Sequence, residues 1–400
     1  MSLAVVSLMD YRSVPDGGAF EIDRDFGRFS LGAATDVRIL LRNRSKASLR
    51  VVMRDELPPG LEQLTAIPEL QLAGNTECEF AYQIKALKRG RYQLSSLAAR
   101  IGRRGALMEK QVRIASAAEV RVYPRFSTTG ESHLIARISR LDDDVRRPRR
   151  VRGHGTDFES LSTYYSGDDP RMIDWKISAK RGYLITRNLQ TERGQQISVM
   201  IDAGRLMASR IGDRSRFEHA LSATVMLSYV AQKRGDAIAV STFSDRIESF
   251  VPPSRGTSIM PRVLDSLSVV EVKQVESDYW QVVAQMMDKL KRRSLLIMMT
   301  DVLDAAGSAG LLLNLTRATS RHLVLCVVLT EPAIGAIAES APGTVDETYL
   351  KAAAASLKLQ RQIALEKMRN KGILTLEAAP EALTVQLIRR YLEIRKANLQ

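Results

Sequence analysis

The chain has 400 residues, a formal net charge of +14, 45% hydrophobic residues and 26% charged residues. This length suits two domains of roughly 100–200 residues each, and the composition excludes wholesale disorder, a collagen-like repeat and a disulfide mini-scaffold. Each third of the chain is mildly basic, so the positive charge does not form the concentrated footprint typical of nucleic-acid binding.

The two cysteines, Cys78 and Cys326, are far apart, and the four histidines are scattered. Neither a CxxC nor an HExxH motif occurs, so the sequence carries no zinc signature. Scarce cysteine favours a reducing, cytoplasmic setting. The apolar start of the N-terminal segment, residues 1–19, is shorter than the about 20 apolar residues that a spanning helix needs.

Residues 20–123 contain short, often alternating apolar runs, which are typical of strands. The runs cover residues 37–41, 49–53, 79–84, 92–97, 112–114 and 120–122. Turn chemistry such as Leu57-Pro-Pro-Gly60 separates them. We therefore predict an immunoglobulin-like β-sandwich over residues 20–123.

Residues 124–195 interrupt this pattern. A short helix is expected over 132–140, followed by a charged run, 141–150, in which aspartates stand beside arginines as in a solvated linker. A phosphate-binding role for Arg146–Arg152 is the alternative, and it would make the protein a nucleic-acid binder whose affinity falls steeply with salt.

From residue 196 to 400, buried apolar strands alternate with amphipathic helices. The expected strands cover 197–201, 237–243, 294–300, 323–329 and 373–376. The expected helices cover 258–267, 278–291, 309–321, 346–370 and 380–396, and Ser215-Arg-Phe-Glu218 has the spacing of a capping box that opens a further helix. The predicted fold class is thus α+β with two domains, a β-sandwich followed by an α/β doubly wound domain whose parallel sheet is covered on both faces.

Acidic residues follow several of these strands, namely Asp202, Asp245, Asp301 and Glu331. Ligands of doubly wound sheets bind beyond the carboxyl ends of the strands, and carboxylates that converge there need neutralisation, which makes Mg²⁺ a candidate. The alternative is that each acid caps the next helix. We favour capping for Asp245 and Glu331 and leave both interpretations open for Asp202 and Asp301.

The runs 201–207, 243–245 and 299–301 resemble a von Willebrand factor A domain. Such domains hold a metal with an Asp-x-Ser-x-Ser loop, a threonine from a second loop and an aspartate after a later strand. The resemblance implies Asp202 and Asp301 as ligands, with Ser277 in place of the threonine. Gly204 and Leu206 stand at the two serine positions, so the implied metal site is degenerate.

A second resemblance is more specific. The block from Gly153 to Lys180, followed by Glu192-Arg193, is similar to the defining segment of the bacterial domain-of-unknown-function family 58, DUF58. In that family a β-sandwich precedes the block and an A-type domain follows it. Members often carry two membrane-spanning helices before the sandwich, and residues 3–12 resemble the tail of the second. The resemblance implies a place at the inner face of the membrane and a MoxR-type AAA+ ATPase as partner.

The same block contains candidate interaction residues. Ser166-Gly-Asp-Asp-Pro170 has the composition of a turn, and Asp174-Trp-Lys176 offers an aromatic anchor between opposite charges. One interpretation is a partner-binding surface; the other is a turn and ion pairs that join the two domains. The residues concerned are Asp168, Asp169, Arg171, Asp174, Trp175 and Lys176.

No catalytic residue is predicted, because the chain has neither a GxSxG nucleophile motif nor a phosphate-binding glycine loop. The leading hypothesis is a non-enzymatic protein-interaction adaptor that works with a MoxR-type AAA+ ATPase in complex assembly or chaperone-like activity. The alternative from another class is a divalent-metal-dependent hydrolase or phosphotransferase that uses Asp202 and Asp301. Nucleic-acid binding through Arg146–Arg152 is the third.

Overall fold

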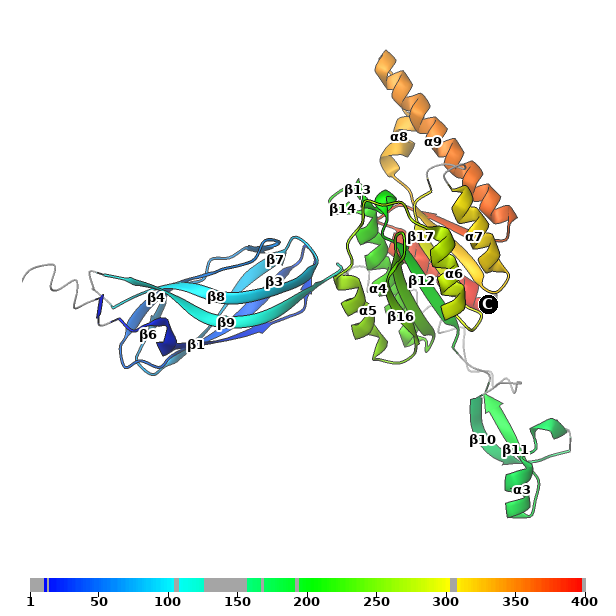
Figure 1. Cartoon of the computed structure of the whole chain (residues 1–400), viewed down its shortest axis with the longest axis horizontal. Helices are drawn as coiled ribbons and strands as arrows, with labels where there is room; N and C mark the ends of the chain where they lie inside the picture. The colour runs from blue at the N-terminus through cyan, green and yellow to red at the C-terminus, as the bar shows by residue number, and fades with distance from the viewer. Residues whose placement is uncertain are drawn as a thin grey trace, which may run out of the picture. The chain divides into compact units, whose positions relative to one another are not determined.

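The computed structural model describes residues 11–12, 14–103, 108–125, 157–166, 169–190, 194–302 and 308–397. The chain divides into two compact units, residues 1–126 with 264–271, and residues 127–263 with 272–400. Both strands and helices are present, so the fold is of the mixed α/β kind (Figure 1). The helix expected over 132–140, the charged run 141–150 and Arg146–Arg152 lie outside the described residues.

The first unit contains two mostly antiparallel sheets in its described part. A short 3₁₀ turn, Gly17–Ala19, precedes them. The four-stranded sheet has the order β1 (Phe20–Phe26), β3 (Ala34–Asn43), β7 (Glu77–Ala86), β5 (Leu61–Gln63). The five-stranded sheet has the order β2 (Phe29–Ser30), β9 (Lys110–Tyr123), β8 (Gly90–Gly102), β4 (Leu49–Asp55), β6 (Leu70–Leu72).

Alternation of side chains explains how these strands form a single core. Along β3, Val37, Ile39 and Leu41 are fully buried while the residues between them are more exposed, as expected for a strand with one covered face. They share one hydrophobic cluster with Val51 and Leu97 of the other sheet. The predicted runs 112–114 and 120–122 belong to one strand, β9, because Ala115, Ala118 and Glu119 between them continue the ladder with β8.

The second unit is built on a six-stranded sheet with the order β16-β15-β12-β17-β18-β19 within the described ranges. Its strands are β12 (Gln196–Asp202), β15 (Ala237–Phe243), β16 (Ile247–Ser254), β17 (Leu295–Thr300), β18 (Leu323–Leu329) and β19 (Leu374–Ala378). All neighbours are parallel except β15 and β16. A two-stranded ribbon, β13 (Arg210–Ile211) with β14 (Arg214–Ser215), lies between β12 and the first long helix.

Helices cover both faces of this sheet (Figure 1). The covering helices are α4 (Arg216–Lys233), α6 (Tyr279–Lys289), α7 (Ala309–Thr319), α9 (Val345–Asn370) and α10 (Leu383–Lys396). Helix α8 (Pro332–Glu339) packs on α9, helix α5 (Ile259–Ser268) follows β16 in the chain, and a 3₁₀ turn, η3 (Arg205–Ala208), follows β12. One face packs against α6, α7 and α9, where Met200, Met298 and Cys326 are buried. Since side chains alternate along a strand, Val199 and Ile201 point to the other face, which α4 and α10 cover.

Two elements of this unit differ from the sequence-based expectation. We expected five strands, and the described chain has a sixth, β16, at the antiparallel edge. Its Pro252 and Pro253 obscured it, because proline removes a ladder donor and is tolerated mainly on edge strands. Helix α8 was also missed, since it is short and has no buried residue. None of the helices in the described ranges combines the length and apolarity needed to cross a bilayer.

A small hairpin lies between the two larger parts of the sequence. It consists of β10 (Asp157–Thr163) and β11 (Ile185–Gln190), which pair antiparallel, with η2 (Pro170–Met172) and α3 (Trp175–Arg181) between them. Helix α3 begins at Asp174, whose side chain accepts a hydrogen bond from the Ile177 N–H at 3.1 Å. It ends at Gly182, which adopts a left-handed conformation with φ of 78°.

Candidate functional site

The two aspartates singled out in the sequence lie at neighbouring strand ends. Asp202 is the last residue of β12, and Asp301 follows β17 directly. These strands are adjacent and parallel, and the chain proceeds outward from them in opposite directions, β15 on one side and β18 on the other. A crevice forms where the strand order reverses in this way, and it is where doubly wound sheets bind ligands.

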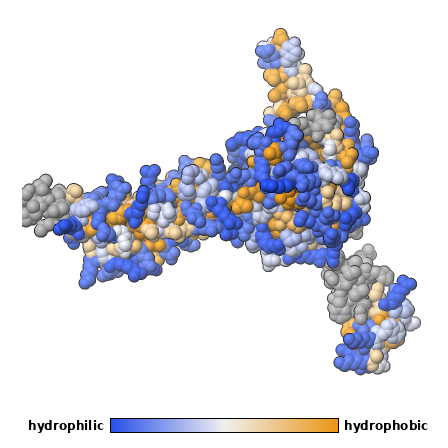
Figure 2. Space-filling view, in the orientation of Figure 1, coloured by the Kyte–Doolittle hydropathy of each residue, from blue (hydrophilic) through white to orange (hydrophobic). Residues whose placement is uncertain are grey.

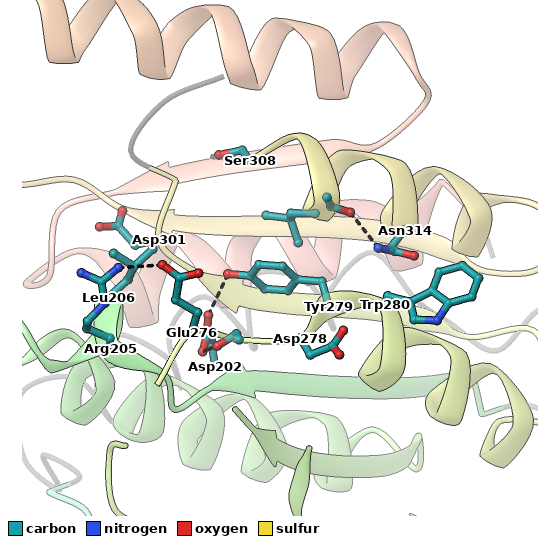
Figure 3. Close-up of a pocket in the computed structure, with 13 residues that line it drawn as sticks. Asp202, Arg205, Leu206, Glu276, Asp278, Tyr279, Trp280, Asp301, Ser308 and Asn314 are labelled. Atoms are coloured by element: carbon teal, nitrogen blue, oxygen red, sulfur yellow. Dashed lines mark hydrogen bonds and ion pairs between the residues drawn. The ribbon is translucent and has the colours of Figure 1, made fainter. Parts of the chain in front are cut away.

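A pocket of about 650 Å³ occupies this position (Figure 3). Asp202, Ser277 and Asp301, the three residues that the family resemblance implies as metal ligands, all line it. The complete described lining is Asp202, Arg205, Leu206, Glu276, Ser277, Asp278, Tyr279, Trp280, Asp301, Ser308, Gly310, Leu311 and Asn314.

The carboxylate of Asp202 is buried and accepts four hydrogen bonds from described residues. Its Oδ1 accepts from the Gly204 N–H at 2.8 Å and from the Ser277 hydroxyl. Its Oδ2 accepts from the Thr300 hydroxyl at 2.6 Å. The same oxygen accepts from the Tyr279 hydroxyl at 3.0 Å (Figure 3). Burial, together with the neighbouring Asp202, raises the pKa of Tyr279, so its hydroxyl stays a donor. These donors use the roughly four acceptor positions that a carboxylate offers.

Gly204 occupies the first serine position of the resembled metal motif, and the structure explains why. A Cβ atom at this residue would lie 2.2 Å from the Ser277 Oγ and 3.0 Å from the Asp202 Oδ1. The backbone therefore approaches the Asp202–Ser277 hydrogen bond more closely than any side chain allows. Leu206 lines the pocket as an apolar residue at the second serine position.

Asp301 is neutralised differently, by two arginines. Its Oδ2 pairs with Arg216, the first residue of α4, and its Oδ1 accepts from Arg361 of α9 at 3.0 Å. The Val302 N–H donates to the same Oδ1 at 2.9 Å. Burial raises the pKa of the Asp301 carboxyl group, while the two guanidinium groups oppose this shift.

These contacts do not fit a divalent cation. Binding one would require Asp202 to give up its hydroxyl donors, and it would place the ion beside the buried guanidinium of Arg216. A magnesium ion prefers several oxygen ligands in octahedral geometry. The described residues contain no group of three or more Asp, Glu, His or Cys side chains arranged to hold an ion.

The rim of the pocket is acidic and aromatic. Glu276 is exposed and pairs with Arg205 at 2.9 Å, and Asp278 is exposed while it caps α6 through a bond from the Gln281 N–H. The indole of Trp280 is 55% exposed. The guanidinium carbon of Arg317 lies 4.5 Å from the centre of that indole, a cation–π contact that holds the ring in place.

The other strand-end acids do not cap helices as we expected. Glu331 stands at the start of α8, but its side chain makes no capping bond and instead pairs with Arg216 at 3.1 Å. The buried guanidinium attracts it, since a second anion offsets the cost of burying that charge. Asp245 lies in the turn before β16, where it accepts a hydrogen bond from the Ser244 hydroxyl at 2.8 Å.

The candidate interaction residues of the hairpin divide into two groups. Asp169 and Asp174 cap η2 and α3, accepting from the Arg171 and Ile177 N–H groups respectively. The side chains of Arg171, Trp175 and Lys176 are exposed. Asp168 lies outside the described residues. The structure therefore gives the two described aspartates a local role in folding and leaves the basic and aromatic side chains at the surface.

Sequence reasoning missed the groups that neutralise the two aspartates. Arg216 sits inside the predicted capping box, and its burial at the start of a helix could not be inferred from spacing. Arg361 stands between two exposed glutamines of α9, and the sequence pattern places Tyr279 and Thr300 at ordinary helix and strand positions. One signal was available, since a buried strand-end aspartate needs donors and Thr300 directly precedes Asp301.

Comparison with known proteins agrees with the family resemblance. Residues 160–347 match the family described as protein of unknown function DUF58. An uncharacterized protein, YeaD of Bacillus subtilis strain 168, is 23% identical over 264 residues, which cover 63% of this chain. The match spans 62% of that relative's own length.

Solved structures give weaker likenesses. The conserved hypothetical protein BatB from Bacteroides thetaiotaomicron is 12% identical, with a TM-score of 0.35, and the match covers 50% of this chain and 99% of BatB. The PapD-like domain 7 of human CEP192 is 11% identical, with a TM-score of 0.21 over 26% of this chain and 84% of that domain.

Proposed function

We propose, starting from the match of residues 160–347 to DUF58, that the chain is a non-enzymatic adaptor that binds a partner protein at the pocket between β12 and β17. The finer fold assignment belongs to the same proposal, with an immunoglobulin-like sandwich ahead of a von Willebrand factor A-like domain. Two observations support it: the sheet order with one antiparallel edge, and the aspartates at the carboxyl ends of β12 and β17.

One observation carries the proposal, namely that the buried carboxylates of the pocket are already satisfied within the chain. Asp202 has four protein donors, and Asp301 has two arginines. A metal-dependent hydrolase needs its carboxylates available to metals or to an attacking water. These contacts therefore do not support the hydrolase or phosphotransferase alternative. An open pocket whose rim exposes charged and aromatic side chains is suited to binding a partner protein.

The rim indicates what kind of partner segment the pocket takes. Exposed Glu276 and Asp278 supply negative charge, and Trp280 supplies an apolar face that also attracts cations. A segment with a lysine or arginine beside an apolar residue matches this chemistry. The partner we propose is the MoxR-type AAA+ ATPase that the family resemblance implies, with assembly or chaperone-like work on the cytoplasmic side of a membrane.

The proposal is tested by measuring affinity between the full chain and the MoxR-type ATPase of its own host by biolayer interferometry. We expect the Glu276→Lys/Trp280→Ala variant to weaken binding at least ~10-fold, since it removes an interfacial aromatic and reverses a rim charge. The matched control is Trp175→Ala, which removes the exposed indole of the hairpin. No binding by the wild type, or loss of binding only in the control, contradicts the proposal.

A further inference from the structure

Helix α9 carries a regular stripe of apolar and small residues on one face. Beginning at its first residue, the stripe repeats at alternating spacings of four and three positions, which is the a/d pattern of a coiled coil. We call it the α9 seam, and its six members are Val345, Tyr349, Ala352, Ser356, Leu359 and Ile363.

The seam faces away from the rest of the second unit. The opposite side of α9 packs on the sheet domain through Ala364, Leu365 and Met368, and Ala354 is buried on that side as well. Arg361, also on that side, reaches Asp301 and donates to the Val302 carbonyl at 2.8 Å. These contacts fix which face of the helix points outward.

The large seam side chains are exposed. Val345 is 71% exposed, Tyr349 73%, Leu359 57% and Ile363 39%. Helices α8 and α9 project from the sheet domain (Figure 1), and hydrophobic residues gather along this arm (Figure 2). A contiguous apolar stripe of this kind on a surface helix marks an interaction surface.

The order of sizes along the seam is that of a self-complementary interface. Large residues occupy both ends, and small residues occupy the centre. In an antiparallel pair of α9 helices, Val345 lies opposite Ile363, Tyr349 opposite Leu359, and Ala352 opposite Ser356 of the other copy. Each a position then meets a d position, and the small central pair lets the two backbones approach closely.

Charge favours the same antiparallel arrangement. The first turn of α9 is acidic, with Asp346 and Glu347, and its last turn is basic, with Lys367 and Arg369. Glu347 closes the capping box of its own helix and Arg369 pairs with Glu377, so Asp346 and Lys367 are the charges that act between copies. Antiparallel pairing places the acidic end of one helix towards the basic end of the other. It also aligns the two helix dipoles antiparallel, which is favourable. A parallel pair would bring like charges together at both ends.

We propose that the α9 seam binds the α9 seam of a second copy of this chain, forming an antiparallel, two-fold symmetric dimer. The neighbouring positions Ala353, Ala355, Gln360 and Gln362 are uncharged, so no like charges face each other along the centre. The dimer interface lies on the projecting arm and does not include the strand-end pocket. The dimer and the binding of a partner protein at the pocket can therefore be tested independently.

Sedimentation velocity of the full chain over a range of concentrations tests the dimer. We expect a monomer–dimer equilibrium whose dissociation constant rises at least ~10-fold in Tyr349→Glu/Leu359→Glu, which places charges in the apolar seam. The matched control is Leu350→Glu, because Leu350 is 59% exposed on the same helix but outside the seam. Circular dichroism establishes that both variants keep their helix content.

The register is tested with cysteines in a Cys78→Ser background, where Cys326 is fully buried. An equal mixture of Tyr349→Cys and Leu359→Cys chains should form a disulfide-linked dimer under mild oxidation, whereas neither variant alone should. A monomer at every concentration, a dimer that the seam variant leaves intact, or cross-linking of either variant alone overturns the proposal. The proposal is also overturned if the wild type is monomeric and the seam variant loses binding to the ATPase.

Discussion

Replacement of Asp202 is the perturbation that most directly tests how the strand-end pocket is held together. Asp202→Ala removes the acceptor of four hydrogen bonds. The Tyr279 hydroxyl can donate to the Thr300 oxygen, 3.0 Å away, and the Thr300 hydroxyl can donate to the Asp301 carbonyl at 3.5 Å. The Gly204 N–H and the Ser277 hydroxyl are then left without an acceptor. At about 1–3 kcal/mol for each unsatisfied buried group, the expected loss in unfolding free energy is about 2–6 kcal/mol.

Asp202→Asn separates the geometry of this site from its charge. The asparagine oxygen can still accept from the Gly204 N–H and the Ser277 hydroxyl, and its amide can donate to Tyr279 and Thr300 after their hydroxyls rotate. Only the charge-assisted part of the bonds is lost, so we expect a cost of about 1–3 kcal/mol. The asparagine variant should be clearly more stable than the alanine variant.

Urea unfolding followed by fluorescence measures both effects. The chain has two tryptophans, so a Trp175→Phe background leaves Trp280 as the only reporter, and Trp280 lies in the pocket. An alanine variant within ~0.5 kcal/mol of its parent would refute the reasoning, as would an asparagine variant that is equally damaged. A bound ion stabilises the folded state that binds it. If millimolar Mg²⁺ raised the unfolding free energy of the parent but not of the alanine variant, the conclusion that the pocket does not fit a divalent cation would be wrong.

Three further outcomes are expected in the second unit. Gly204→Ser, which restores one serine of the resembled motif, should destabilise by about 1–3 kcal/mol in urea unfolding and create no Mg²⁺ binding in calorimetry, because its Cβ collides with a side-chain oxygen. Tyr391→Phe should cost about 1–3 kcal/mol in the same unfolding assay, because its buried hydroxyl donates to buried Asp236. Burial lowers the pKa of His219 and His322, so unfolding free energy should fall as pH drops below about 6.5, by up to ~1.4 kcal/mol per pH unit for each residue.

Each of these outcomes has a control. Gly310→Ala adds a Cβ with nothing within 4 Å and should be tolerated. Tyr229→Phe alters a tyrosine that is 46% exposed and should change stability by less than ~0.5 kcal/mol. For the histidines, the sign follows from the unfolded chain binding more protons below its pKa, so a His219→Asn/His322→Asn variant should show a flatter slope between pH 7.5 and 5.5. An unchanged slope would assign the acid sensitivity to other groups.

The alternation of strands and helices in residues 196–400 was predictable because each central strand is a mainly apolar run that is buried along nearly its whole length. Val199, Met298 and Val327 are all fully buried, and continuous burial of this kind leaves a strong pattern in the sequence. Strand β16 left no such pattern, since only Val251 among its residues is buried and two prolines follow. Strand β1 likewise mixes charged and apolar residues, as edge strands do.

The positions of the site residues were partly predictable, and their environment was not. Strand ends place Asp202 and Asp301 at one edge of the sheet whatever their partners are, because parallel neighbours share a direction. The partners Arg216 and Arg361 come from helices 85 and 60 residues away from Asp301. Such distant pairings depend on how α4 and α9 pack, which no local pattern encodes. The metal expectation rested on the two aspartates and Ser277, and it could not include the arginines that neutralise Asp301.

The central claim is that a partner protein docks at the strand-end pocket, and hydrogen–deuterium exchange of the complex with the MoxR-type ATPase tests it most directly. The account predicts slower exchange on binding in residues 204–208 and 275–281, which contribute much of the rim, with the hairpin residues 169–190 unchanged. Slower exchange confined to the hairpin, or none in the pocket segments of a saturated complex, would contradict it.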